Sequence, residues 1–223
     1  MSALIKICGL STRDTLEAAL SAGADMVGFV RFPRSPRHVE LDHGRELSRM
    51  ARGRAERVLL VVDPTDSELD EAVEALDPDV LQLHGTEAPA RVAAIHGRTS
   101  RPIMKAIGVA RADDLGRAAD YAGVADRIIL DAKPPRGAAL PGGNGLSFDW
   151  ALLDDLDPRL RVMLSGGLDP ANVAEAIGRT RVRAVDVSSG VEIRPGEKDP
   201  EKIWAFVRAA RAAFTGHQDR IAS

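Results

Sequence analysis

The chain has 223 residues, of which 44% are hydrophobic, a formal net charge of −3 and a single cysteine. These values exclude an internal disulfide and argue against a nucleic-acid partner, which would usually show as a basic stripe. No apolar run is long enough to cross a bilayer and the first residues lack the apolar stretch of a signal peptide, so we expect a cytoplasmic protein without a membrane partner.

Short apolar runs alternate along the chain with stretches rich in alanine and charged residues. The predicted strands are Leu4–Cys8, Met26–Val30, Val58–Val62, Val80–His84, Ile103–Ile107, Arg127–Asp131, Arg161–Ser165 and Ala184–Ser188. The predicted helices are Thr12–Ala22, Asp42–Arg52, Ser67–Leu76, Glu87–His96, Arg111–Tyr121, Asp149–Leu156, Pro170–Ile177 and Asp199–Phe214. Continuous apolar strands of this kind are typical of a parallel sheet covered by helices.

Eight such units of roughly 28 residues each fit an α/β fold, namely a single all-parallel eight-stranded (β/α)8 TIM barrel over residues 1–223. A doubly wound sheet is the alternative, but it usually carries a Gly-rich turn after its first strand, and Cys8-Gly9-Leu10 is not that turn.

Two kinds of local signal refine this prediction. Asp66 and Ser67 indicate the start of the third helix, and Asp169-Pro170 indicates an N-cap followed by proline at the first helical position. Long loops follow the second strand (31–40) and the sixth (132–147), and we expect them to act as lids.

Polar or reactive residues gather at the carboxyl ends of the predicted strands. In a barrel these ends form one mouth, where active sites lie. The residues at these ends are Cys8, Arg31, Asp63, His84, Gly108, Asp131, Ser165 and Ser188. The beginnings of the strands show no comparable cluster, so the pattern favours an enzyme.

Cys8 and Asp131 are the candidate catalytic pair. A lone cysteine is commonly a small buried hydrophobe, and an aspartate after a strand can simply cap a helix or bind Lys133. At the barrel mouth, however, Cys8 would face the pocket, with Lys6 two residues earlier on the same side, and a nearby ammonium favours the thiolate. A carboxyl group in a partly desolvated site is more readily protonated, which would suit Asp131 as a general acid.

Two glycine-containing loops indicate a phosphate site. Ser165-Gly166-Gly167 follows the seventh strand and Ser188-Ser189-Gly190 follows the eighth. Backbone N–H groups and a short helix N-terminus in such loops suit an anion, and the loops after these two strands are the usual phosphate site of many barrels.

For other polar residues the sequence allows more than one role. Arg31, Arg34 and Arg37 lie on one loop, and any of them could bind a carboxylate bidentately. Lys6, Gln82, His84 and Asp186 are possible substrate contacts, although each also has a structural interpretation. The five histidines are scattered and none lies near the cysteine in sequence, so no metal site is predicted.

The motifs together resemble the phosphoribosylanthranilate isomerase family. They are Lys6-Ile7-Cys8-Gly9, 23–29, Ser35-Pro36-Arg37, 82–85, Leu130-Asp131, 142–145, 148–150, 164–168 and 186–192. The resemblance runs through the whole chain in order. It implies an aldose–ketose isomerase of tryptophan biosynthesis that acts without a cofactor on a small phosphosugar by an Amadori rearrangement.

The same resemblance implies particular roles. Cys8 would be the general base at ribose carbon 2, Asp131 the general acid at the ring oxygen, and Arg37 the residue that holds the anthranilate carboxylate. The two glycine loops would hold the phosphate. Both a monomer and a homodimer stay open. One departure is visible, because Asp131 is followed by Ala132 where many relatives have a hydroxyl residue, and the loop beyond it is long.

Two alternatives are weaker. A related isomerase of histidine biosynthesis acts on aminoimidazole carboxamide ribotide, uses a carboxylate where Cys8 stands, and binds a phosphate at each end of its substrate. A non-catalytic phosphate-binding barrel would keep the glycine loops without needing Cys8 and Asp131 at the same mouth.

Overall fold

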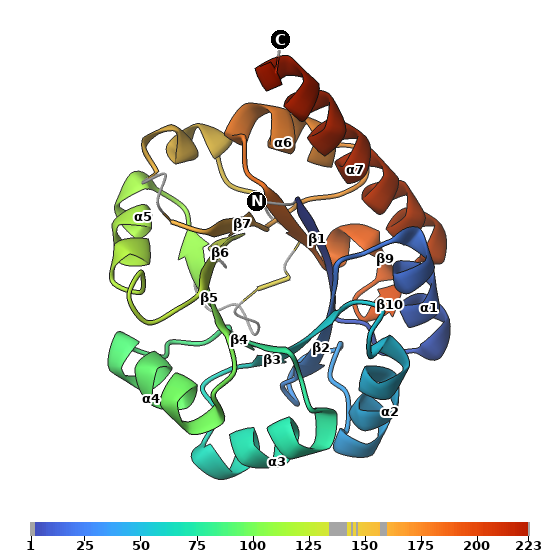
Figure 1. The fold of residues 1–223 in the computed structure, drawn as a ribbon, viewed down its shortest axis with the longest axis vertical. Helices are drawn as coiled ribbons and strands as arrows, with labels where there is room; N and C mark the ends of the chain where they lie inside the picture. The colour runs from blue at the N-terminus through green and yellow to red at the C-terminus, as the bar shows by residue number, and fades with distance from the viewer. Residues whose placement is uncertain (1–2, 134–141, 144, 146, 157–159, 223) are drawn as a thin grey trace.

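The computed structural model describes residues 3–133, 142–143, 145, 147–156 and 160–222. Eight parallel strands close into a barrel in sequence order, β1 pairing with β2 on one side and with β8 on the other, as Figure 1 shows nearly end-on. The strands are β1 (Leu4–Cys8), β2 (Met26–Arg31), β3 (Glu56–Val61), β4 (Val80–Leu83), β5 (Ile103–Val109), β6 (Arg127–Ala132), β7 (Val162–Leu164) and β8 (Ala184–Val187). The TIM-barrel prediction is confirmed.

Helices form a ring around these strands (Figure 1). They are α1 (Arg13–Ala22), α2 (Leu41–Ala51), α3 (Asp66–Leu76), α4 (Pro89–Thr99), α5 (Ala112–Ala119), the 3-10 helix η1 (Trp150–Asp155), α6 (Val173–Thr180), the single turn η2 (Ser189–Val191) and α7 (Pro200–Ala222). A short antiparallel hairpin, β9 (Glu192–Arg194) and β10 (Glu197–Lys198), lies between η2 and α7 and was not predicted.

Two predicted helix starts were wrong. Thr65, not Asp66 or Ser67, caps α3, because its side chain accepts the Glu68 N–H in a capping box. The helix predicted from Pro170 begins at Val173. Asp169 does accept the N–H groups of Ala171 and Asn172, as predicted for an N-cap, but these residues form a turn that precedes the helix.

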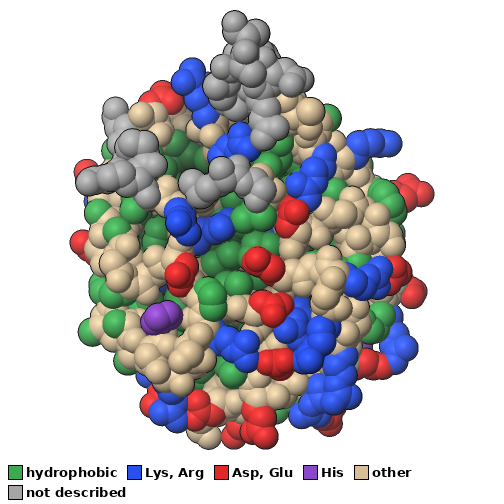
Figure 2. Space-filling view, in the orientation of Figure 1, with side chains coloured by type: hydrophobic (Ala, Val, Ile, Leu, Met, Phe, Trp, Pro, Cys, Tyr) green, Lys and Arg blue, Asp and Glu red, His purple; other side chains and the backbone are tan. Residues whose placement is uncertain are grey.

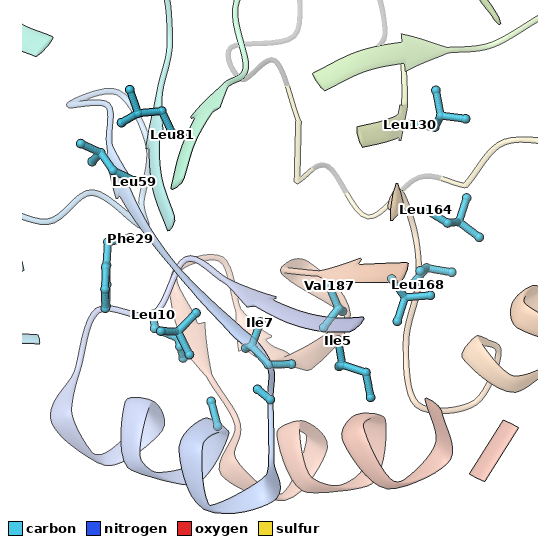
Figure 3. Packing of buried hydrophobic residues seen from close by; sticks show 14 of the residues in the cluster. Ile5, Ile7, Leu10, Phe29, Leu59, Leu81, Leu130, Leu164, Leu168 and Val187 are labelled. Atoms are coloured by element: carbon cyan, nitrogen blue, oxygen red, sulfur yellow. The ribbon is translucent and has the colours of Figure 1, made fainter. Parts of the chain in front are cut away.

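The side chains of the strands alternate between two cores. Outward residues such as Ile5 and Ile7 pack against the helices, and Figure 3 shows both projecting from β1 toward the helical layer. Inward residues near the beginnings of the strands form a second apolar cluster that fills the barrel, made of Met26, Val58, Val80, Met104, Ala106, Ile129, Met163 and Ala184. Above it lies a small cluster of Cys8, Val30 and Leu60. The barrel interior is therefore filled with apolar side chains at the amino ends of the strands, and Cys8 lies toward their carboxyl ends.

Aspartates just before β2, β4 and β6 accept an N–H group near the start of the preceding strand. Asp25 accepts from Ile5 N at 2.7 Å, Asp79 from Arg57 N at 2.8 Å and Asp126 from Ile103 N at 2.8 Å. A backbone donor at a strand start needs such a partner, because burying it unpaired is costly. These three bonds help to fix the register of neighbouring strands.

Charges of both signs are interspersed over the face that Figure 2 shows, around an apolar centre. This agrees with the interleaved Arg, Asp and Glu residues of the sequence. Within the part of the chain that the structure describes, no helix combines the length and apolar character needed to cross a membrane.

We predict that Asp126→Ala lowers the free energy of unfolding by about 1 kcal/mol, because the Ile103 N–H loses its acceptor. Asp126→Asn keeps a carbonyl oxygen there and should lose clearly less. Urea denaturation measures both, with the exposed Asp113→Ala as the control that stays near the parent value. Equal losses for the Ala and Asn variants would contradict the proposed strand-start bond.

Candidate active site

The carboxyl ends of the strands surround a pocket with about 740 Å³ of atom-free space, its open mouth included. Most of the predicted site residues lie in its wall: Cys8, Arg37, Gln82, His84, Asp131, Ser165, Gly166, Gly167, Asp186, Ser188 and Ser189. Lys6 and Gly190 are not among the wall residues. Lys6 is fully buried below the pocket, and Gly190 packs behind one of its loops.

Three of the residues at the predicted strand ends do not line the pocket. Arg31 bonds to His38 and Glu40 of its own loop. Asp63 accepts the N–H of Thr86 and so joins two neighbouring loops. Neither of these, nor Gly108, is among the described residues that line the pocket. The strand-end pattern was therefore right about the place of the site but too inclusive about its members.

Cys8 lies in a buried charged network. Lys6 Nζ is 2.8 Å from Asp186 Oδ1, and Asp186 Oδ2 accepts a 3.2 Å hydrogen bond from Ser165 Oγ. Burial raises the pKa of the Cys8 thiol above its usual value, and the Lys6 ammonium offsets this only in part. Lys6 favours the thiolate as expected, but desolvation by burial outweighs its charge in the free protein.

Asp131 is held from two sides. Its Oδ1 accepts the N–H of Ala132 at 2.9 Å, and its Oδ2 lies 3.3 Å from His84 Nε2. Gln82 Nε2 is in turn 3.0 Å from His84 Nδ1. When the Gln82 amide donates to Nδ1, the ring carries its proton on Nε2 and donates to the carboxylate. With the amide reversed, Nε2 can accept a proton from a neutral Asp131. The imidazole can therefore support either form of the acid.

The loop after β6 reaches over this pair. Residues 134–141, 144 and 146 lie outside the described residues, so the predicted 132–147 lid is described only in part. Its Gly142 lies so close to the pair that a Cβ there would be 2.5 Å from both Asp131 Oδ2 and His84 Nε2. Gly143, Gly145 and Gly142 all line the pocket. The described part of the loop is thus in contact with the site.

Of the three loop arginines, Arg37 is the one found among the described wall residues. It is buried and makes a bidentate pair with Glu192, Nε to Oε1 at 2.7 Å and Nη2 to Oε2 at 2.8 Å. Its Nη2 also donates to Gly143 O at 3.2 Å. One edge of the guanidinium is therefore occupied by the protein, and among the described residues Nη1 has no hydrogen-bond partner, so its side is the one open to a ligand anion.

The two glycine loops meet at one side of the pocket. Gly166 and Gly167 both have positive φ values, 83° and 63°, a backbone shape that glycine adopts readily. Gly190 has a different task. Its backbone packs on the next loop so tightly that a Cβ would lie 1.9 Å from Leu168 O. The loops after β7 and β8 are thereby pressed together.

Lys198 supports the second loop from behind. Its Nζ donates to Ser188 O at 2.8 Å, to Ser188 Oγ at 3.1 Å and to Glu192 Oε1 at 2.7 Å. Burial lowers the pKa of Lys198 to about 8, although Glu192 acts in the opposite direction. Burial alone would raise the pKa of the Glu192 carboxyl. The hydrogen bonds and charges of Arg37 and Lys198 outweigh burial, so this pKa is lowered.

The roles of Glu192 and Lys198 were missed by sequence reasoning. The signal was present, because Pro195-Gly196 between two short polar runs is a hairpin pattern. The hairpin packs against the Arg37 loop, where a Cβ on Gly196 would lie 2.4 Å from Pro36 O. Among the described residues, no group of three or more His, Cys, Asp or Glu side chains could hold a metal ion.

Comparison with known proteins places this site in context. Residues 5–209 match the family model described as N-(5′-phosphoribosyl)anthranilate (PRA) isomerase. The N-(5′-phosphoribosyl)anthranilate isomerase of Azorhizobium caulinodans is 60% identical over 213 residues, which is 96% of this chain and 93% of the relative.

Two solved structures are similar over nearly their whole length. One, described as monomers of the dimeric phosphoribosylanthranilate isomerase from Thermotoga maritima, has a TM-score of 0.82 at 34% identity and covers 94% of this chain and 99% of that one. The other is a phosphoribosylanthranilate isomerase in complex with reduced 1-(o-carboxyphenylamino)-1-deoxyribulose 5-phosphate. It has a TM-score of 0.82 at 33% identity with the same coverage.

We predict that Lys6→Met and Asp186→Asn move the Cys8 pKa in opposite directions. Lys6 lowers this pKa and Asp186 raises it, so the Met variant should titrate at higher pH than the parent and the Asn variant at lower pH. The pH dependence of the rate of iodoacetamide alkylation reports the midpoint, since only the thiolate reacts. Circular dichroism must show that both variants fold. Midpoints that shift in the same direction would show that the Lys6–Asp186 pair does not govern Cys8.

Proposed function

The chain belongs to the N-(5′-phosphoribosyl)anthranilate isomerase family, an isomerase of tryptophan biosynthesis, and from that premise we propose that its pocket works by acid–base catalysis with Asp131 and Cys8. The substrate is a small phosphosugar, N-(5-phosphoribosyl)anthranilate. The observation that carries the proposal is that Cys8 and Asp131 line one pocket together with Arg37 and the two glycine loops.

Asp131 would act first, as general acid. Its proton passes to the ring oxygen, the bond from that oxygen to carbon 1 breaks, and the nitrogen lone pair forms a C=N⁺ bond to carbon 1. His84 supports Asp131 on one oxygen and the Ala132 N–H on the other, so the carboxyl group keeps its position as it gives up the proton.

Cys8 would act second, as general base. The iminium draws electrons from carbon 2 and acidifies its C–H bond, and the thiolate removes that proton to give an enolamine. Proton gain at carbon 1 and loss from the enol oxygen then give the ketose. Lys6 and Lys198 both stabilise the thiolate through their charges, with Lys6 the stronger of the two.

The two ends of the substrate would be held by different elements. Arg37 would receive the anthranilate carboxylate on the Nη1 side of its guanidinium, because Glu192 occupies the other edge. The phosphate would lie against Ser165, Gly166 and Gly167 and against Ser188 and Ser189, with Gly190 joining the two loops. Holding both ends places carbon 2 against Cys8 and the ring oxygen against Asp131.

Gln82 and Asp186 would contribute as wall residues that also orient His84 and Lys6. Whether the chain works as a monomer or a homodimer stays a prediction, as does its cytoplasmic location.

We predict that Cys8→Ala and Asp131→Asn each lower kcat at least about a hundredfold, because each removes one proton-transfer group while keeping the shape of the pocket. The assay follows the loss of phosphoribosylanthranilate fluorescence. Asp113→Asn, an exposed change on α5, is the matched control and should keep parental activity. Parental turnover in either catalytic variant would rule out its assigned role. No turnover by the folded parent protein would rule out the reaction itself.

For Arg37→Ala we predict a KM at least about tenfold higher, because the charge-assisted contact between the Nη1 side of the guanidinium and the carboxylate is lost. Arg34→Ala, on an exposed part of the same loop, should leave KM unchanged. Steady-state kinetics measure both. If KM rises equally in the two variants or in neither, the carboxylate is held elsewhere.

A further inference from the structure

Three charged side chains are buried together just behind the pocket wall. Arg37, Glu192 and Lys198 are each almost wholly inaccessible, with side-chain exposures of 6%, 4% and 1%. Glu192 is shared, because its Oε1 accepts from both Arg37 Nε and Lys198 Nζ at 2.7 Å. With two cations and one carboxylate, the cluster carries a surplus positive charge, which is unusual for a buried site.

The surplus charge matters because of where each member lies. Arg37 lines the pocket, whereas Glu192 and Lys198 do not appear among its described wall residues. Without the lysine, the Arg37–Glu192 pair would have no net charge. An incoming carboxylate would then lose its hydration without gaining a net positive charge in return. With the lysine, the carboxylate becomes the second anion and completes a cluster of two cations and two anions.

We infer that Lys198, acting through Glu192, sets the affinity of Arg37 for the substrate carboxylate and is a specificity-determining positioning residue. The inference rests on the proposed function, in which Arg37 holds that carboxylate. Glu192 contributes the geometry by fixing one edge of the guanidinium, and Lys198 contributes the charge. A substrate without the carboxylate gains nothing from either.

Lys198 also contacts one of the two loops assigned to the phosphate. The same ammonium donates to Ser188 O and Oγ, on the loop assigned to the phosphate. A purely structural lysine would therefore influence both ends of the substrate alike. A lysine that acts through Glu192 and Arg37 would influence the carboxylate end selectively, and this difference can be measured.

The cluster has a pH-dependent consequence. The charged groups that act on Lys198 are Glu192, Arg37 and Cys8, and burial lowers the Lys198 pKa to about 8. A bound carboxylate favours the ammonium and raises that pKa, so binding takes up a proton. Affinity for a carboxylate ligand is then full below about pH 8 and falls as the pH rises through that value.

Two stable ligands separate these contributions. One is reduced 1-(o-carboxyphenylamino)-1-deoxyribulose 5-phosphate, the compound in the related complex. The other is its phenylamino counterpart, which lacks the carboxyl group but keeps the phosphate. Calorimetric titration at pH 7 and pH 9 would compare the parent with Lys198→Met. The control is Lys202→Met, which removes a neighbouring lysine that donates to the Glu192 backbone carbonyl rather than to its carboxylate.

We expect the parent to bind the carboxylated ligand about tenfold more weakly at pH 9 than at pH 7, as one linked proton requires. Lys198→Met should already be weak at pH 7 and should show no such pH dependence. The phenylamino ligand should change little with either pH or the Lys198 substitution, and Lys202→Met should behave like the parent.

Several outcomes would overturn the inference. One is a pH dependence of binding that is unchanged in Lys198→Met. Another is an equal loss of affinity for the two ligands in that variant, which would assign Lys198 a purely structural role. If Lys198→Met does not fold, proton uptake is measured in the parent and in Cys8→Ser, and its absence with the carboxylated ligand decides against the inference. Failure of the folded parent to bind either ligand would instead refute the proposed function from which it proceeds.

Discussion

The ion pair between Lys6 and Asp186 joins the first strand to the last and lies directly beneath the pocket. The two residues are register partners in β1 and β8, and both are buried. Desolvation offsets much of the attraction in such a pair, whereas losing one partner costs about 3–5 kcal/mol. The pair therefore does more to specify where the barrel closes than to stabilise it. Cys8, two residues beyond Lys6, and Ser165, bonded to the second oxygen of Asp186, take their positions from it.

The sequence predicted the barrel and most of the pocket wall because both follow from local periodicity. A strand alternates its side chains, so Lys6 and Cys8 had to share the inner side once β1 was located. Parallel strands in chain order then bring every strand end to one mouth, which is why Cys8, His84 and Asp131 could be grouped without knowing any distance. The same rule could not exclude Arg31 or Asp63, whose directions depend on bonds within their own loops.

Long-range partners were beyond this kind of reasoning. Arg37 and Glu192 are 155 residues apart, and nothing in the composition of either segment reports that they pair. The sequence also does not show which residue begins a helix when several local signals compete. Asp169 accepts the N–H groups of Ala171 and Asn172 as an N-cap would, yet residues 170–172 form a turn and α6 begins at Val173. The net effect on Cys8 also needed the structure, since sequence shows the nearby lysine but not the extent of burial.

That burial bears on the order of the proposed steps. In the free protein burial raises the pKa of the Cys8 thiol, because desolvation outweighs the charges of Lys6 and Lys198, and this favours the thiol form. A thiol cannot take up a proton, so Cys8 must first release its own proton to solvent at the open mouth of the pocket before it can act as the base. In the proposed mechanism, ring opening by Asp131 would place the positive charge of the iminium beside Cys8. That charge would favour loss of the thiol proton at the moment when carbon 2 becomes acidic. In the proposed mechanism the acid step would therefore precede the base step, and the raised pKa would keep the single cysteine in its less reactive thiol form until then.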